Sequence, residues 1–285
     1  MYQFPIGVMV NSFKQETHDA IRTAAKIGAK GLQITCTKGE RAPENFTKEA
    51  RRELLDFVRS QGLCFSAVCG DLGHGFGDPE LNPELIEKSK RIMDVAKDLG
   101  TDIVTTHIGV VPEDPDHPRY RIMQEACYEL AQYADSIGSR FAVETGPETA
   151  VVLKNFLDSL GSKGVSVNLD PANLCMVTGD DPVAAVYTLK DYIVHTHAKD
   201  GNLLVKGNPE YIYRVVHPVP ETAKGIRYFE EVPLGTGSVP FPAYLKALED
   251  IGYRGYLTIE REVGANPVAD IKTAYDHLTK VMAEN

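Results

Sequence analysis

The sequence has 285 residues, of which 43% are hydrophobic and 25% charged, a balance typical of a globular protein with a large core. Its formal net charge of −10 and pI near 5.3 do not provide the basic footprint of a nucleic-acid-binding protein. Five cysteines without a CxxC pair are typical of reduced thiols, and no apolar run approaches the length of a membrane span. We therefore expect a soluble, cytoplasmic protein that binds neither nucleic acid nor membrane.

Short apolar runs alternate with longer amphipathic segments from one end of the chain to the other. Segments such as "HDAIRTAAKIG" and "KEARRELLDFVRSQG" have helical periodicity and end in a glycine that caps a helix. The predicted strands cover residues 6–10, 31–35, 65–69, 102–107, 140–145, 165–170, 192–197 and 256–261. Eight βα units predict an α/β protein, a closed (β/α)₈ TIM barrel formed by residues 1–285 as a single domain. An open doubly wound sheet is the alternative, but no GxGxxG follows the first strand.

Two longer connections interrupt this alternation. Residues 71–83, "DLGHGFGDPELNP", form a predicted loop after the third strand, and residues 201–240 separate the seventh strand from its helix. A connection as long as the second is usually functional or locally structured. It contains candidates for a lid over the barrel mouth, with a surface hairpin of no catalytic consequence as the alternative: Tyr211, Tyr213, Arg214, His217 and Arg227.

Ionisable residues stand at the predicted carboxyl ends of five strands. The carboxyl ends of barrel strands meet at one mouth, where barrel enzymes place their chemistry. The residues concerned are His107, Glu144, Asp170, His197 and Glu260. Three carboxylates at one mouth repel each other unless a cation lies between them. Three carboxylates with one imidazole suit Mn²⁺, Mg²⁺ or Co²⁺ better than a thiol-rich Zn²⁺ site, although Zn²⁺ stays open.

Ordinary salt bridges are the alternative to a metal. Glu144 and Glu260 would then pair with Arg140, Arg261 or Lys199. Glu262 competes with Glu260, because alternate residues of a strand share a face. We choose Glu260 as the ligand because it lies just inside the predicted strand end.

The stretch "VHTHAKDG" places His195, His197 and Lys199 at alternate positions, so in a strand all three point the same way. We expect His197, nearer the strand end, to be the metal ligand and His195 to lie one layer deeper, in the core or supporting the ligand. Lys199 then stands just beyond the metal, within reach of a substrate oxygen; a solvated loop end is its alternative.

The motifs "VETG", "NLDPAN", "VHTHAKDG" and "PLGTGSVPFPAYLKALEDIGYRGYLTIERE" resemble the xylose isomerase-like barrel superfamily, the sugar phosphate isomerase/epimerase group, over nearly the whole chain. The resemblance implies one divalent metal ion, with Mn²⁺ the first choice, held by Glu144, Asp170, His197 and Glu260. Similarity to the tagatose and psicose 3-epimerases implies that Glu144 and Glu260 also act as catalytic acid and base. The implied reaction is isomerisation or epimerisation of a keto sugar, sugar phosphate or inositol-derived substrate through an enediolate.

Three positions depart from the ketose epimerases and put a free ketohexose in doubt. Asn173 stands where a substrate-contacting histidine is found, Leu203 replaces an arginine, and Ala150 replaces a glutamate. A different pocket is therefore expected, with substrate contacts from His74, His107, Asn173 and Lys199.

Other functions compete with the isomerase. A metal-dependent lyase or dehydratase on a keto sugar or keto-inositol needs the same proton abstraction. An abasic-site endonuclease on the same barrel is opposed by Asn173, which stands in place of a required histidine, and by the net charge. A non-catalytic sugar-binding barrel is the third alternative. The expected partner is a small-molecule carbohydrate, and a homodimer or homotetramer stays open.

Overall fold

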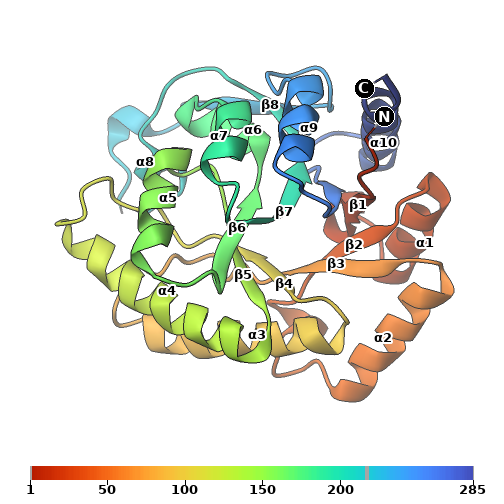
Figure 1. Cartoon of the computed structure of the whole chain (residues 1–285), viewed down its shortest axis with the longest axis horizontal. Helices are drawn as coiled ribbons and strands as arrows, with labels where there is room; N and C mark the ends of the chain where they lie inside the picture. Colours follow the sequence, from red (N-terminus) through yellow and green to blue (C-terminus); the bar gives the residue numbers. More distant parts are fainter. Residues whose placement is uncertain (1, 216–217, 285) are drawn as a thin grey trace.

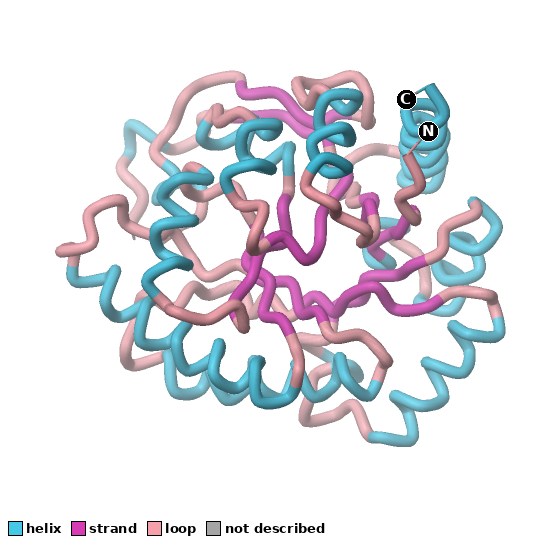
Figure 2. The backbone as a smooth tube through the Cα atoms, viewed as in Figure 1, coloured by secondary structure: helices cyan, strands magenta, loops and turns pink. Residues whose placement is uncertain are grey.

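Parallel strands form a closed barrel surrounded by helices in the computed structural model, which describes residues 2–215 and 218–284 (Figures 1 and 2). Neighbouring strands follow the order β1-β10-β7-β6-β5-β4-β3-β2. The strands are β1 (Ile6–Met9), β2 (Gly31–Thr35), β3 (Cys64–Cys69), β4 (Ile103–Thr106), β5 (Arg140–Glu144), β6 (Val165–Leu169), β7 (Ile193–Ala198) and β10 (Leu257–Ile259). All eight predicted strands are present within the described chain, and the predicted (β/α)₈ barrel is confirmed.

Helices cover the outside of the barrel, as Figure 2 shows. Thr47 begins α2 by accepting a hydrogen bond from the Ala50 N–H, and Gly28 and Gly138 end α1 and α4 in the left-handed conformation that the sequence predicts. The helices are α1 (Thr17–Ile27), α2 (Lys48–Ser60), α3 (Asn82–Asp98), α4 (Pro118–Ile137), α5 (Ala150–Ser159), α7 (Pro182–Thr188), α9 (Phe241–Asp250) and α10 (Pro267–Glu284). Shorter helical turns are η1 (Val10–Phe13), η2 (Gly39–Arg41), α6 (Pro171–Asn173) and the π-helical η3 (Leu174–Thr178).

The strands are buried on both faces, because side chains fill the barrel interior and helices cover its exterior. Every residue of β6 is buried, from Val165 to Leu169. Parallel pairing sets Glu144 beside Asn168 and His197 beside Thr258, so the polar strand ends gather at the same mouth of the barrel.

Strands β1, β4, β5 and β6 each end one residue earlier than predicted, and two further strand ends differ in the opposite sense or by more than one residue. β10 stops at Ile259, so Glu260 follows the strand rather than lying just inside its end, although its N–H still donates to the Ala198 carbonyl at 3.2 Å. β7 extends to Ala198, one residue further than predicted. Both differences arise because pairing with the neighbouring strand, rather than local composition, decides where a ladder ends.

The long connection after β7 is locally structured. Its strands β8 (Asp200–Leu203) and β9 (Phe229–Val232) pair antiparallel, and α8 (Pro209–Ile212) and η4 (Glu221–Ala223) lie between them. His217, one of the predicted lid residues, falls outside the described residues.

Asp200 organises the base of this connection. Its buried carboxylate accepts hydrogen bonds from four backbone N–H groups, those of Gly201, Gly235, Gly237 and Val239. A Cβ at Gly237 would lie 2.3 Å from Asp200 Oδ1, so a side chain there would displace the carboxylate. Two backbone N–H groups of the "GTG" motif therefore bind the buried carboxylate of Asp200.

The described helices include none long and apolar enough to cross a membrane. All five cysteines are free in the described chain.

Candidate metal centre and active site

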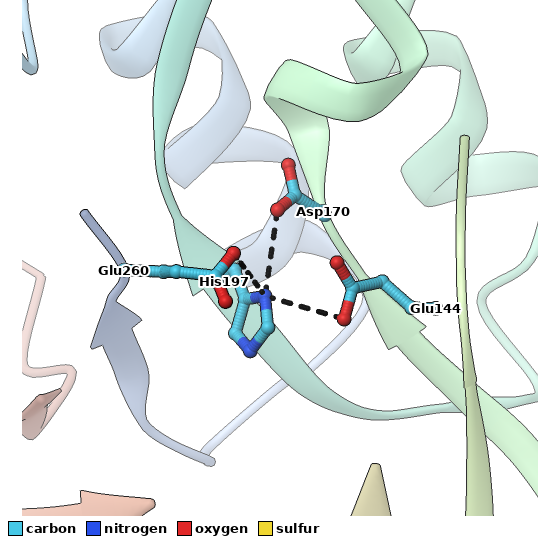
Figure 3. A group of neighbouring side chains, drawn as sticks. All are labelled: Glu144, Asp170, His197 and Glu260. Carbon is cyan, nitrogen blue, oxygen red and sulfur yellow. Dashed lines mark ion pairs between the residues drawn. The ribbon is translucent and has the colours of Figure 1, made fainter. Parts of the chain in front are cut away.

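Four of the predicted residues meet at the barrel mouth. Glu144 ends β5, Asp170 directly follows β6, His197 lies in β7, and Glu260 directly follows β10. One ligand atom from each lies within 4.8 Å of all the others, and all four residues are buried. His197 Nδ1 is 3.6 Å from Glu144 Oε2, 3.4 Å from Asp170 Oδ2 and 3.4 Å from Glu260 Oε2 (Figure 3).

Two atoms of this cluster have no hydrogen-bond partner among the described residues. They are His197 Nδ1 and Asp170 Oδ2, and both are fully buried. Buried polar atoms without partners are costly, and they mark places where an ion or ordered water completes the structure. Three carboxylate groups and one imidazole nitrogen provide the hard donors that a divalent cation prefers. The residues present therefore fit a divalent metal ion.

Two buried amides that sequence reasoning missed support the cluster. Gln33 Oε1 lies 3.0 Å from Nε2 of both His195 and His197, and Gln33 Nε2 donates to Thr105 Oγ1 at 3.0 Å. Asn168 Nδ2 donates to Glu144 Oε2 at 3.2 Å. Each is the one amide side chain inside a largely apolar predicted strand, which is the signal that could have found it. His195 lies one layer below His197, as predicted.

Lys199 is buried and bridges two glutamates. Its Nζ lies 3.0 Å from Glu260 Oε2 and 2.8 Å from Glu262 Oε2. Burial opposes the charge, but Glu260 and Asp170 outweigh it and hold the pKa of Lys199 well above its ordinary value. Burial likewise favours protonated Glu260, yet Lys199 and His197 bring the pKa of Glu260 well below its ordinary value. The side chain of Glu262 is 63% exposed, against 8% for that of Glu260, so Glu260 rather than Glu262 joins the cluster.

The salt-bridge alternative holds only for Lys199 and Glu260. Arg140 pairs with Asp135 instead. Arg261 pairs with the carboxylates of Glu231 and Asp270. Among the described residues Glu144 therefore has no lysine or arginine partner, and its ion-pair neighbours are the imidazoles of His107 and His197.

Amide and imidazole groups surround Glu144. Asn173 Nδ2 donates to Glu144 Oε1 at 2.9 Å. His107 Nε2 is 3.8 Å from the same oxygen, and its Nδ1 is 3.1 Å from Asp71 Oδ2. Burial lowers the pKa of His107, but Glu144 and Asp71 outweigh burial and raise it to about 9. In the same way, Glu260 and Glu144 overcome the effect of burial and hold the pKa of His197 well above its ordinary value.

Two cavities open at this mouth. The inner cavity, of about 540 Å³, is lined by Glu144, Asn173, Lys199 and Glu260, and from the long connection by Tyr213, Arg227 and β9. The outer cavity, of about 880 Å³, is lined by the loop that contains His74, by the start of α4, and by Tyr213 and Arg214. His107 lines both. His74 is exposed in the outer cavity, whose described wall also contains His107 but neither Asn173 nor Lys199.

The fold and the site define a TIM barrel protein with a buried carboxylate and imidazole cluster at the mouth. The model of the family described as xylose isomerase-like TIM barrel matches residues 21–281, and the chain belongs to this family. The resemblance inferred from the sequence motifs is thereby confirmed.

Three relatives illustrate the match. A putative L-ribulose-5-phosphate 3-epimerase of Haemophilus influenzae is 26% identical over 84% of this chain and 81% of its own length. A xylose isomerase domain protein from Planctomyces limnophilus, known from a crystal structure, is 25% identical in sequence to this chain. The two structures superpose with a TM-score of 0.81 over 99% of this chain and 99% of that one. A xylose isomerase-like TIM barrel protein from Mycobacterium smegmatis, in complex with magnesium, is 17% identical with a TM-score of 0.73, and covers 100% of this chain and 99% of that one. The chain is thus similar to sugar isomerases and epimerases at the level of the family.

Proposed function

We propose that this protein is a divalent-metal-dependent isomerase or epimerase of a keto sugar, a sugar phosphate or an inositol-derived substrate. The observation that carries the proposal is the buried cluster, in which His197 Nδ1 faces three carboxylates. Glu144, Asp170, His197 and Glu260 would hold the ion, with Mn²⁺ the first choice and Mg²⁺, Co²⁺ or Zn²⁺ as alternatives. Such an ion polarises the substrate carbonyl and stabilises the enediolate that forms when the adjacent carbon loses its proton.

Glu144 and Glu260 are the proposed acid and base. They come from different strands, β5 and β10, and both line the inner cavity, so a bound sugar can lie between them. One carboxylate removes the proton beside the carbonyl. Return of a proton by the other carboxylate to the opposite face inverts the centre, and return to the adjacent carbon gives the isomer.

The surroundings of the two glutamates support a division of labour. Lys199 helps to keep Glu260 ionised, so at neutral pH Glu260 is in the carboxylate form that a base requires. Glu144 receives hydrogen bonds from two neutral amides, those of Asn168 and Asn173. Lys199, His107 and Asn173 line the inner cavity and are the proposed contacts for substrate oxygens, whereas His74 can reach only a part of the substrate that extends into the outer cavity.

The unpaired cysteines support the further proposal that the enzyme works in the reducing cytoplasm. Its proposed binding partner is a small carbohydrate. We also propose that the chain assembles as a homodimer or a homotetramer.

Metal analysis and deuterium exchange test this function. The purified protein should carry about one divalent ion per chain, which elemental analysis measures before and after chelation. NMR in D₂O, with a panel of keto sugars, their phosphates and keto-inositols, should show metal-dependent deuterium uptake at the carbon beside a carbonyl. Release of water or an alcohol would instead identify a lyase, and absence of both metal and exchange would contradict the proposal.

Matched variants assign the bases. Glu144→Gln and Glu260→Gln should each lower the exchange rate by about 100-fold to 10,000-fold, the usual contribution of a general acid or base. Glu262→Gln is the control, because it removes a carboxylate that contacts Lys199 from outside the cluster. Full activity of Glu260→Gln would transfer the role of base to Glu262.

A further inference from the structure

The reacting part of the substrate does not need the outer cavity, because the inner cavity can hold it. The inner cavity, at about 540 Å³, is by itself within the range of small-ligand sites, roughly 300–1,000 Å³. The proposed acid and base, Glu144 and Glu260, line the inner cavity, while the described wall of the outer cavity contains neither of them. The two cavities share Asp71, His107 and Tyr213. A substrate bound at the cluster can therefore extend past these three residues into the outer cavity. The part of the substrate that lies there does not meet Glu144 or Glu260.

The wall of the outer cavity is built from closely packed backbone. A Cβ on Gly75 would lie 2.6 Å from the Cα of Gly109, so the loops after β3 and β4 touch through their glycines. A Cβ on Gly77 would lie 2.8 Å from Cδ of Arg119, and the missing side chain lets this arginine lie across the loop. Arg119 also forms an ion pair with Glu210, which ties the start of α4 to α8. The cavity is thus held open by contacts within the fold.

Charges around the outer cavity are largely neutralised in pairs. Arg119 is paired with Glu210, and His107 is paired with Asp71. Two further charged residues of the wall, Asp78 and Arg214, are of opposite sign. The described part of this wall therefore offers no excess of positive charge for a phosphate.

Apolar surface lies between these polar groups. Among the residues that line the cavity, Pro79 and Leu81 are exposed and Val215 is partly exposed. The ring of Tyr213 is also partly exposed and stands 5.7 Å from the ring of His107, measured between centroids. A sugar ring presents hydroxyls at its rim and C–H groups on its faces, so it matches a wall that alternates between paired polar groups and apolar or aromatic surface.

We infer that the substrate is a keto sugar that carries a second, uncharged sugar unit, with the reacting carbons in the inner cavity and the second unit in the outer cavity. The inference rests on the proposed function in taking the inner cavity as the place of reaction. Binding of the second unit supplies energy that orients the reacting unit against Glu144 and Glu260.

Calorimetric titration of the metal-loaded protein tests the inference with defined probes. The probes are D-fructose, four of its glucosyl derivatives (turanose, maltulose, leucrose and isomaltulose) and D-fructose 6-phosphate. At least one glucosyl-fructose should bind about 10-fold more tightly than fructose, which corresponds to about 1.4 kcal/mol. Equal affinity for fructose and all four derivatives would overturn the inference, and so would tighter binding of the phosphate than of every derivative.

A plug in the outer cavity supplies the second measurement. Leu81 lines this cavity and is 42% exposed, so Leu81→Trp fills space without disturbing the core. Leu204→Trp is the matched control, because Leu204 is 44% exposed and is absent from the described walls of both cavities. Leu81→Trp should abolish the gain from the glucosyl unit and leave fructose affinity unchanged, whereas equal weakening of both ligands would overturn the inference. If the natural protein prefers a glucosyl-fructose but neither binds a metal ion nor catalyses deuterium exchange, the result would count against the proposed function and not against the second sugar site.

Discussion

Gln33 Oε1 lies 3.0 Å from Nε2 of His197, inside the barrel and 164 positions away in sequence. A carbonyl oxygen accepts hydrogen bonds, so this contact places a proton on Nε2 and directs the lone pair of a neutral imidazole to Nδ1, the atom that faces the three carboxylates. Asn168 Nδ2 is also near Nε2, but at a longer distance of 3.3 Å. Gln33 thereby prepares His197 to bind a cation through Nδ1.

Replacement of Gln33 should weaken metal binding. Gln33→Leu removes the acceptor, and we expect about a 10-fold to 100-fold loss in metal affinity, the usual cost of losing a partner that orients a metal ligand. Competition with a fluorescent chelator measures the affinity independently of turnover. Gln33→Glu keeps an acceptor at the same place and should retain more of the affinity than Gln33→Leu. Equal metal affinity of Gln33→Leu and the natural protein would remove Gln33 from this role.

Replacement of Lys199 should move the pH dependence of activity. Lys199 helps to hold the pKa of Glu260 below its ordinary value, so in Lys199→Met this pKa rises and Glu260 becomes protonated at a higher pH. The acidic limb of the pH–rate profile, which lies well below pH 4.5 in the natural protein, should therefore move upward toward that ordinary value in Lys199→Met. Exchange rates measured from pH 3 to pH 9 test the shift. Glu262→Gln controls for the outer contact of the lysine, and an unmoved limb in Lys199→Met would contradict the proposed role of Glu260.

Glu148 should make stability depend on pH. Burial raises the pKa of this carboxyl to about 8 in the folded protein, against 4.5 for the ordinary group. Between these values the folded state binds the extra proton, so the free energy of unfolding falls as pH rises, by up to about 1.4 kcal/mol per pH unit, and levels off above pH 8. Glu148→Gln should remove this slope, because the amide stays neutral and can still accept from the Val111 N–H.

Urea unfolding at several pH values measures the slope. Glu80→Gln, which alters an exposed carboxylate, serves as the control. The same pH dependence in Glu148→Gln and the natural protein would show that another group carries it.

Asp200 should determine the stability of the long connection. Asp200→Asn replaces one acceptor oxygen with an amide donor that faces backbone N–H groups, and we expect a loss of about 2–4 kcal/mol in the free energy of unfolding. Urea unfolding measures the loss, and limited proteolysis should cut residues 201–240 sooner. Asp56→Asn, at an exposed position, is the matched control. Equal stability and cleavage in the two variants would contradict this role.

Much of the barrel and of the cluster was predictable because both follow from local patterns. Alternation of apolar strands with amphipathic helices identified eight βα units, and closure of such units brings the carboxyl ends of the strands together. Glu144, Asp170 and His197 each stood at such an end. The end of β10 was misplaced, because the ladder there stops at Ile259.

Contacts between strands were less predictable. Lys199 is paired with Glu260, whereas the sequence pattern left open a solvated loop end. His74 stood in a predicted loop, and only the path of that loop placed it in the outer cavity. Sequence reasoning gave Asp200 no role, and the structure shows that it is the buried acceptor for the "GTG" motif.

The sequence by itself determined the order of strands and helices, the polar strand ends and the family, because these depend on residue spacing along the chain. Only the tertiary structure decided that Gln33 reaches His197, that Lys199 bridges two glutamates, and that two cavities share Tyr213. These contacts depend on how the strands tilt and stagger around the closed barrel and on where the long connection packs, and no local periodicity encodes those distances.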